Sequence, residues 1–343
     1  MKALIKFVLP LFIFSCAWNQ KELEQLDDFK GSNDEVFLEQ IDLDKKVTEK
    51  FKVQEPKVVE APKATAAVVV KPKPVIPTKP KIVVTKKSTV PADYPPELLE
   101  FDKASIEIWK KFIPKMTIGE SIIYDITYTG IVIGKVAMTT GPINKIQNRD
   151  AYQIVGRLKS APFYSYVYDI DDQVESYIDK EYFTPVKFAL VQRESSKKIN
   201  NLELFDREEL KSYYRYRKTK DDETIFKKKD TFIPRYFQDS FSAMFFLRGL
   251  PLKVGETYTF PVVTNAKIWL MDINVLGKEK IETAIGTKDS IKLRAITRYT
   301  GEVVKKGVID FWLSDDDKRF MLKFNAEVKI GSVKGAIVSY EVK

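Results

Sequence analysis

The chain has 343 residues, 44% hydrophobic and 31% charged, with a net charge of +9, no histidine and one cysteine. This composition excludes internal disulfides, Ser-His-Asp and Cys-His catalysis, and zinc sites with the usual ligand sets. The positive charge is uneven, because residues 50–92 hold ten lysines against two glutamates. That stretch is too polar and proline-rich to build a core, so its charge indicates a solvated segment and argues against nucleic-acid binding.

The first sixteen residues have the layout of a signal peptide, with two lysines, an apolar run over 7–14, and the small residue Ser15 before Cys16. The apolar run is roughly half of the about 20 residues that a membrane-spanning helix needs, so export is favoured over a permanent span. Residues 13–16 resemble the lipobox of bacterial lipoproteins, in which the cysteine receives the lipid. We therefore predict a lipoprotein signal peptide over 1–16, with lipidation at Cys16 and membrane attachment through that lipid. The alternative is an ordinary signal peptide.

The location follows from the same residues. An aspartate directly after the lipidated cysteine resembles the inner-membrane retention signal of enteric bacteria. This chain has Ala17 at that position, so the periplasmic side of the outer membrane is favoured.

Residues 17–92 are predicted to be a disordered tether. Residues 17–49 are acidic and suggest at most a short, marginal helix. From residue 53 to 87 the chain is rich in Pro, Lys, Val and Ala, which favours extended polyproline II. At about 3.1 Å per residue, such a segment reaches on the order of 100 Å. It is either a passive spacer or a contact for anionic cell wall or phospholipid.

Residues 93–343 are predicted to be a β-rich domain that begins with a helix. Pro95 and Pro96 suit a first helical turn, and apolar residues follow at helical spacing until Pro114. Trp109 and Phe112 are expected to dock this helix on the domain.

From Gly119 the apolar period changes to two, which predicts strands. The alternation recurs at 151–158, 163–179, 186–193, 202–217, 223–230, 257–276, 291–299, 307–313 and 319–342. Strands and helices do not alternate, so a parallel sheet is not expected. The sequence predicts a mainly β fold: one large curved antiparallel sheet, a half-barrel or partly closed barrel, after a disordered Lys/Pro-rich linker.

Residues 238–251 depart from this strand pattern. Asp239 or Ser240 can cap a helix whose body, 241–247, is apolar almost all round, and Gly249 with Pro251 ends it. A helix that is apolar on every side is buried, so we expect it to plug the concave face of the sheet.

Carboxylate, Ser-Lys or oxygen-ligand chemistry remains possible, and the carboxylates could act as acid–base pairs for glycoside cleavage or as calcium ligands. Two groups qualify: Asp169, Asp171, Asp172 and Asp315, Asp316, Asp317. Neither group has the spacing of a calcium loop, and both flank strands where aspartates make turns or solvated edges. We therefore assign no catalytic, metal or cofactor-binding residues and predict no cofactor.

Two aromatic groups alternate along predicted strands and are candidates for a glycan or lipid surface, or for ordinary sheet packing. They are Tyr164, Tyr166, Tyr168 and Tyr213, Tyr214, Tyr216. An exported protein makes nucleic acid a poor ligand for them.

Several segments resemble the bacterial family of domain of unknown function 3108. They are GESIIYDITYTGIVIGKVAM, YIDKEYFTPVKF, DSFSAMFFLRGLPLKVGETY, DFWLSDDDKRFMLKF and GSVKGAIVSYE, in the family's order over about 117–342. The resemblance implies a secreted or periplasmic β-rich domain without agreed catalytic residues. Its architecture is similar to the half-barrel of lipoprotein-carrier proteins, which by itself does not establish a function.

Three functional hypotheses remain open. The first is a non-enzymatic envelope module that binds a hydrophobic ligand, such as lipid, or an envelope-protein partner in the concave sheet face. The second is a structural or assembly lipoprotein tethered to the cell wall or a membrane complex. The third is a carboxylate-dependent glycan hydrolase.

Overall fold

The computed structural model describes residues 43–56, 90–299, 305–328 and 331–343. Within them, fourteen strands form one antiparallel sheet, in the order β8-β7-β6-β5-β4-β3-β2-β1-β14-β13-β12-β11-β10-β9. The strands are β1 Glu120–Tyr128, β2 Ile131–Ile146, β3 Arg149–Ser160, β4 Asp171–Asp179, β5 Pro185–Glu194, β6 Lys197–Asp206, β7 Lys211–Lys220, β8 Glu223–Phe232, β9 Thr257–Thr264, β10 Lys267–Ile281, β11 Lys288–Tyr299, β12 Lys305–Ser314, β13 Met321–Glu327 and β14 Ser332–Val342. The helices are α3 Lys45–Lys50, α4 Pro96–Trp109, α5 Pro162–Ser165 and α6 Ser242–Gly249. The predicted fold class is confirmed.

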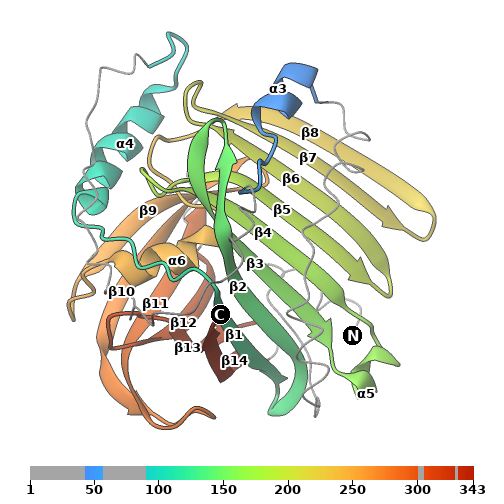
Figure 1. The fold of residues 1–343 in the computed structure, drawn as a ribbon, viewed down its shortest axis with the longest axis vertical. Coiled ribbons are helices and arrows are strands. Elements are labelled where there is room, and N and C mark those ends of the chain that lie inside the picture. Colours follow the sequence, from blue (N-terminus) through green and yellow to red (C-terminus); the bar gives the residue numbers. More distant parts are fainter. Residues whose placement is uncertain (1–42, 57–89, 300–304, 329–330) are drawn as a thin grey trace, which may run out of the picture.

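The sheet is built from two meanders that meet at the chain ends of the domain. Strands β1 to β8 each pair with the next, as do β9 to β14, and β14 returns to pair with β1. The two edges of the sheet are therefore β8 and β9, which are consecutive in sequence. The sheet curves, and α6 lies within its concave side (Figure 1).

The concave face holds the main core because apolar residues alternate along the strands. On β1, Ile122, Tyr124 and Ile126 all point into this core and are at most 2% exposed. Helix α6 fills the space above them, with Phe246 fully buried and Phe245 3% exposed. The predicted plug is therefore confirmed, although it begins one residue later and ends two residues later than expected, and we call α6 the plug helix.

The sequence around the plug helix explains how it starts and stops. Asp239 Oδ1 accepts from the backbone N–H groups of Phe241 and Ser242, both at 2.7 Å, as an N-terminal cap. At the other end the chain crosses Gly249, whose carbonyl accepts from Ile113 N at 3.0 Å. A Cβ at Gly249 would lie 2.2 Å from the Phe112 ring, so only glycine permits this crossing.

Helix α4 docks on the domain through Trp109 and, in the segment that follows the helix, Phe112, as predicted; both rings pack on the plug helix. The centroid of the Phe246 ring lies 4.3 Å from that of Trp109 and 4.6 Å from that of Phe112. Trp109 Nε1 also donates to the carbonyl of Tyr182 at 2.9 Å. The helix is thereby fixed to both the plug and the sheet.

The opposite, convex face of the sheet has a second apolar cluster, which residues 43–56 cover. Phe51 is 4% exposed among side chains that include Tyr177 and Leu202. Lys50 Nζ lies 2.7 Å from Asp206 Oδ2, and Gln54 exchanges backbone hydrogen bonds with Lys145. The expectation of a disordered tether over 17–92 is therefore wrong for residues 43–56, which we call the clasp. Most of the Lys/Pro-rich stretch lies outside the described residues.

The predicted strand over 163–179 is also wrong in its first half. Residues 162–165 form α5, and β4 begins only at Asp171. Pro162 occupies the first helical position, and the carbonyl of Ala161 accepts from the N–H groups of Tyr164 and Ser165. Those local hydrogen bonds outweigh the alternation of aromatic and small side chains.

Candidate functional site

The two sheet edges approach each other without forming a ladder, at a junction that we call the seam. The turn between β9 and β10, Asn265–Ala266, contacts the part of the sheet formed by β6 to β8. Asn201 Nδ2 donates to Asn265 Oδ1 at 2.9 Å, and Lys229 Nζ donates to the carbonyl of Ala266 at 3.0 Å. Side-chain contacts thus replace strand pairing here.

A buried carboxyl stabilises this turn. Glu203 is 1% exposed, and its Oε1 accepts from Ala266 N at 3.0 Å and from Ser212 Oγ at 2.6 Å. Burial raises the pKa of Glu203 to about 7. Asn265 and Ala266 both have positive φ, 54° and 52°, which is the type I′ geometry that favours Asn and Gly. The hydrogen bonds at Ala266 offset the strain of its left-handed backbone.

Helix α4 closes the seam from the side of β9. Asp102 is 8% exposed, its Oδ1 accepts from Arg235 N at 2.6 Å, and its Oδ2 accepts from the Tyr94 hydroxyl at 3.1 Å. The same hydroxyl lies 3.1 Å from the carbonyl of Ile233. Burial raises the pKa of both Asp102 and Tyr94. Buried contacts therefore hold α4 to the chain that leaves β8.

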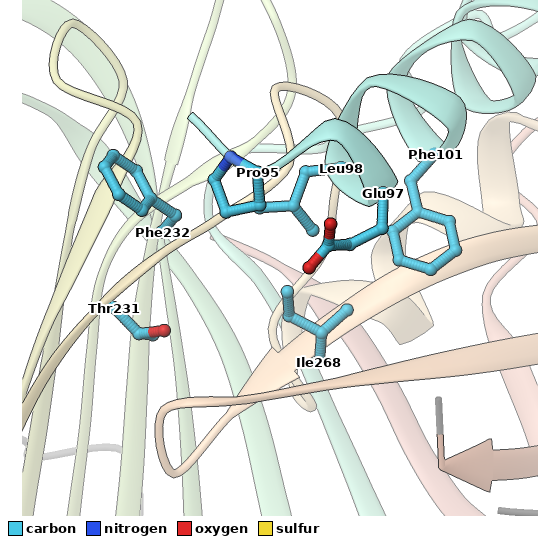
Figure 2. A pocket seen from close by; sticks show the side chains of 7 residues that line it. All are labelled: Pro95, Glu97, Leu98, Phe101, Thr231, Phe232 and Ile268. Atoms are coloured by element: carbon cyan, nitrogen blue, oxygen red, sulfur yellow. The ribbon is translucent and has the colours of Figure 1, made fainter. Parts of the chain in front are cut away.

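A groove of about 510 Å³ lies beside the seam, between the start of α4, the end of β8 and the start of β10 (Figure 2). Five of its seven lining side chains are apolar, and Glu97 and Thr231 add a carboxylate and a hydroxyl. The lining consists of Pro95, Glu97, Leu98, Phe101, Thr231, Phe232 and Ile268. This volume falls in the usual range of small-molecule sites, about 300 to 1,000 Å³.

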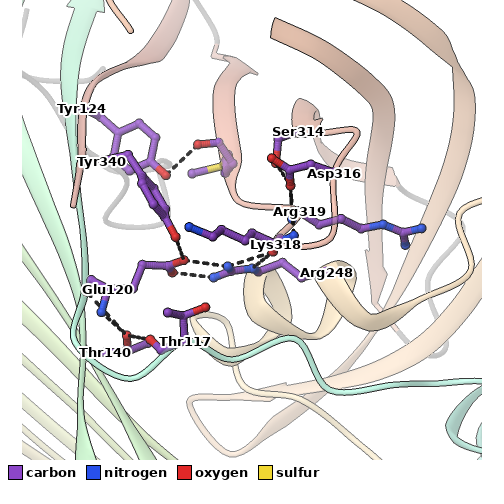
Figure 3. Close-up of polar contacts among 11 residues, drawn as sticks. Thr117, Glu120, Tyr124, Thr140, Arg248, Ser314, Asp316, Lys318, Arg319 and Tyr340 are labelled. Carbon is purple, nitrogen blue, oxygen red and sulfur yellow. Dashed lines mark hydrogen bonds and ion pairs between the residues drawn. The ribbon is translucent and has the colours of Figure 1, made fainter. Parts of the chain in front are cut away.

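A buried ion pair anchors the plug helix to the sheet (Figure 3). Arg248 Nη1 and Nη2 donate to the two oxygens of Glu120 at 2.6 and 2.8 Å, and both side chains are at most 4% exposed. Arg248 also donates to the carbonyl of Lys318, and the Tyr340 hydroxyl donates to Glu120 Oε1 at 3.1 Å. Because these charged and polar groups satisfy one another's hydrogen bonds, we assign the cluster a structural role.

The first aspartate group does not form an acid–base pair. Asp171 makes a two-bond ion pair with Arg157, at 3.0 and 2.9 Å. Asp172 is buried, accepts from Gln192 Nε2 at 2.8 Å, and has its pKa raised to about 6 by that burial. The solvated edge expected for this group is therefore wrong at Asp172. The third member, Asp169, lies 3.4 Å from Ser160 Oγ.

The second aspartate group makes a turn, as expected. Asp316 Oδ1 accepts from the backbone N–H groups of Lys318 and Arg319, both at 2.9 Å. Asp315 pairs with Lys278 at 2.6 Å, while Asp317 contributes its carbonyl to Lys115. Among the residues that the structure describes, no group of three or more His, Cys, Asp or Glu side chains could hold a metal ion.

The tyrosines divide between packing and exposure. Tyr213 packs on Phe51 of the clasp, while Tyr214 and Tyr216 stack on each other with ring centroids 6.3 Å apart. Tyr166 is 91% exposed beside α5. Tyr168 donates its hydroxyl to Glu194, which ties the α5 loop to β5.

Sequence reasoning did not find the groove. Its residues come from three segments that meet only in the folded sheet, so no local spacing marks them. The one sequence feature that could have indicated the groove is the apolar pair Leu98 and Phe101. It lies near the start of α4, whereas Trp109 docks the end of that helix on the domain. Cys16 lies outside the described residues, and no described helix has the length and apolar character to cross a membrane.

Solved structures similar to this chain have little sequence in common with it. A β-barrel-like protein of domain of unknown function 1849 from Brucella abortus is 11% identical, covers 66% of this chain and 98% of its own, and has a TM-score of 0.43. A candidate lipoprotein from Parabacteroides distasonis is 10% identical, with coverages of 67% and 99% and a TM-score of 0.31. The lipoprotein LppX from Mycobacterium tuberculosis is 10% identical, with coverages of 72% and 99% and a TM-score of 0.20.

No curated protein sequence matches the chain. The family described as protein of unknown function (DUF3108) matches residues 123–338, which is more than half of the chain and agrees with the resemblance noted in the sequence. The protein therefore belongs to the DUF3108 family.

Proposed function

We propose that this protein is a non-enzymatic module of the cell envelope that binds an elongated apolar ligand, such as the acyl chain of a lipid, in the groove beside the seam. The supporting observation is the groove itself, whose lining is mostly apolar and whose volume is about 510 Å³. The plug helix fills the concave face where the sequence analysis placed the ligand. The proposed site is therefore at the edge of the sheet.

The lining defines the chemistry of the ligand. Leu98, Phe101 and Ile268 offer contacts for a hydrocarbon chain, and Glu97 is the charged side chain among the residues that line the groove. A ligand whose head group donates a hydrogen bond or carries a cation would suit that carboxylate. The side chains of Asp171, Asp172, Asp315 and Asp316 make ion pairs, buried hydrogen bonds or turn contacts, so glycan hydrolysis gains no support.

The envelope location rests on the N-terminal sequence. The apolar run over 7–14, followed by Ser15 and Cys16, supports export and lipid attachment, and Ala17 supports the outer membrane. The lipid would hold the domain near a source of acyl chains, which fits the proposed ligand.

A dansyl-labelled undecylamine, whose cationic head group suits the Glu97 carboxylate, tests the groove directly. Protein comprising residues 17–343 should raise the dansyl fluorescence in a saturable manner. Ile268→Trp fills the groove and should weaken binding by about tenfold or more, since the hydrocarbon chain of the probe would lose its contact surface in the groove. Leu276→Trp is the matched control, because it adds the same ring on the same strand at a side chain that is 43% exposed. Equal affinity of the Ile268→Trp variant and the unmodified protein would remove the groove from consideration.

A further inference from the structure

Two neighbouring turns at the end of the sheet opposite the plug helix carry apolar side chains into solvent. They are the β1–β2 turn, residues 127–134, and the β3–β4 connection, residues 160–168, which includes α5. Strands β2 and β3 pair up to Gly134 and Ser160, so the two turns are adjacent. In Figure 1, α5 lies at the lower right, away from α6. We call these two segments the apolar tip.

The exposure at the apolar tip is high for such large side chains. Tyr166 is 91% exposed, Val167 75% and Phe163 72%, and Ile131 on the neighbouring turn is 51% exposed. Single exposed apolar residues are normal on a soluble surface. A group of four on adjacent turns marks a contact surface.

The α5 half of the apolar tip has a defined shape. Tyr168 N and Val167 N both donate to the carbonyl of Tyr164 at 2.8 Å, and the Tyr168 hydroxyl lies 2.9 Å from Ser196 Oγ. Ala161 N donates to the carbonyl of Ile133 and so connects the two turns. The fold thus presents Phe163, Tyr166 and Val167 outward on a hydrogen-bonded turn, which lowers the backbone ordering cost of binding.

The charge pattern of the apolar tip is complementary to a lipid surface. Neither 127–134 nor 160–168 contains a charged residue. The first charged side chains below the tip are largely paired with one another, because Lys135 contacts Asp125 while Arg157 and Lys159 contact Asp171. Asp169 adjoins them and balances the remaining cation. The exposed Lys334, opposite Thr127 on β14, is offset by the exposed Glu327 on β13, so these described charges around the tip sum to zero. An uncharged aromatic tip above a neutral, paired shell matches the zwitterionic headgroup layer of a bilayer, where aromatic side chains concentrate.

We propose that the apolar tip inserts into the headgroup region of a phospholipid bilayer, and so orients the domain with α5 toward the membrane. This attachment is separate from the groove and from any lipid at Cys16. Because the charged shell is neutral, binding requires no anionic lipid and changes little with salt.

A fluorescent label at the tip tests this proposal. The protein comprising residues 17–343 has no cysteine, so Tyr166→Cys or Val254→Cys gives a single attachment point for an NBD fluorophore. Val254 is 57% exposed beside the plug end of the sheet and serves as the control. With phosphatidylcholine vesicles, NBD at position 166 should become brighter and shift its emission to the blue, while NBD at position 254 should not. The response should persist in 0.5 M NaCl.

The contribution of the apolar side chains is measured by vesicle flotation. Phe163→Ser with Tyr166→Ser should lower the vesicle-bound fraction roughly tenfold or more, since two apolar contacts are lost. Val254→Ser with Leu276→Ser, which removes two exposed apolar residues elsewhere, should leave it unchanged. Equal loss in both pairs, no vesicle binding, or binding only to anionic vesicles would overturn the proposal. Shielding of the label at position 166 without vesicles, in a dimeric protein, would assign the tip to a second copy instead.

Discussion

Replacing Phe246 by alanine would test whether the plug helix is a core element of the fold. The Phe246 ring is fully buried and lies against four other rings, with centroid distances of 4.3 Å to Trp109, 4.6 Å to Phe112, 5.0 Å to Phe260 and 6.3 Å to Phe183. These four rings come from α4, the segment that follows it, β9 and the β4–β5 connection. The substitution therefore removes a contact shared by four parts of the domain.

The expected cost follows from this burial. Truncating a fully buried Phe to Ala costs about 3 to 5 kcal/mol, from lost transfer energy and the cavity left behind. The surrounding rings are large and held by their own elements, so little collapse into the cavity is expected. In a domain of this size about 1 kcal/mol moves the melting midpoint by roughly 2 to 4 °C, which gives a fall of about 6 to 20 °C.

Thermal unfolding followed by circular dichroism would measure this shift in residues 17–343. Phe163→Ala is the matched control, because it removes the same ring at a side chain that is 72% exposed and should change stability by under about 0.5 kcal/mol. A shift below about 2 °C for Phe246→Ala would contradict the reasoning. It would mean that the plug helix is a movable lid and that the sheet folds without it.

Three further predictions concern charged and anchoring groups. Arg248→Met leaves Glu120 buried without its cation and should cost about 3 to 5 kcal/mol in urea unfolding, and Glu120→Leu in the same chain should restore much of that loss. Glu203 binds a proton in the folded state that the unfolded chain has released above about pH 4.5, so its contribution to stability is lost as the pH rises toward 7. Glu203→Gln should flatten this decline in urea midpoints measured from pH 5 to 7.5; an unchanged slope would contradict the raised pKa. Cys16→Ala should move the protein out of the membrane fraction of cells, and unchanged fractionation would argue against lipidation.

Local periodicity was sufficient to predict the elements whose pattern matches their burial. The period of two on β1 and the all-round apolar helix at 242–249 both reflect one dominant environment, the concave core. Sequence reasoning therefore identified the antiparallel sheet and the plug.

Local periodicity failed where two environments compete. The aromatic alternation over 163–168 is typical of a strand, yet Pro162 starts a helical turn and the side chains face solvent. The clasp was missed for a related reason, since α3 has six residues and would be marginal alone. Its stability comes from Phe51 and Lys50, whose partners lie about 100 residues or more away in the sequence.

The candidate site was the least predictable part. The groove depends on where the edges of β8 and β9 meet, and that placement follows from the pairing of β1 with β14 in the middle of the sheet. The local sequence around a lining residue such as Ile268 therefore does not indicate that the residue lies in a groove.

The pairing of β14 with β1 also sets an order of events during synthesis. Strands β1 to β8 are translated in sequence and can pair as they emerge, but the outer side of β1 has no partner until residues 332–342 are made. A chain that stops before β14 would expose unpaired backbone in the middle of the sheet, where it can join another chain. The eleven residues of β14 therefore complete the centre of the sheet, and the proposed export would favour a chain that stays unfolded until β14 has been delivered.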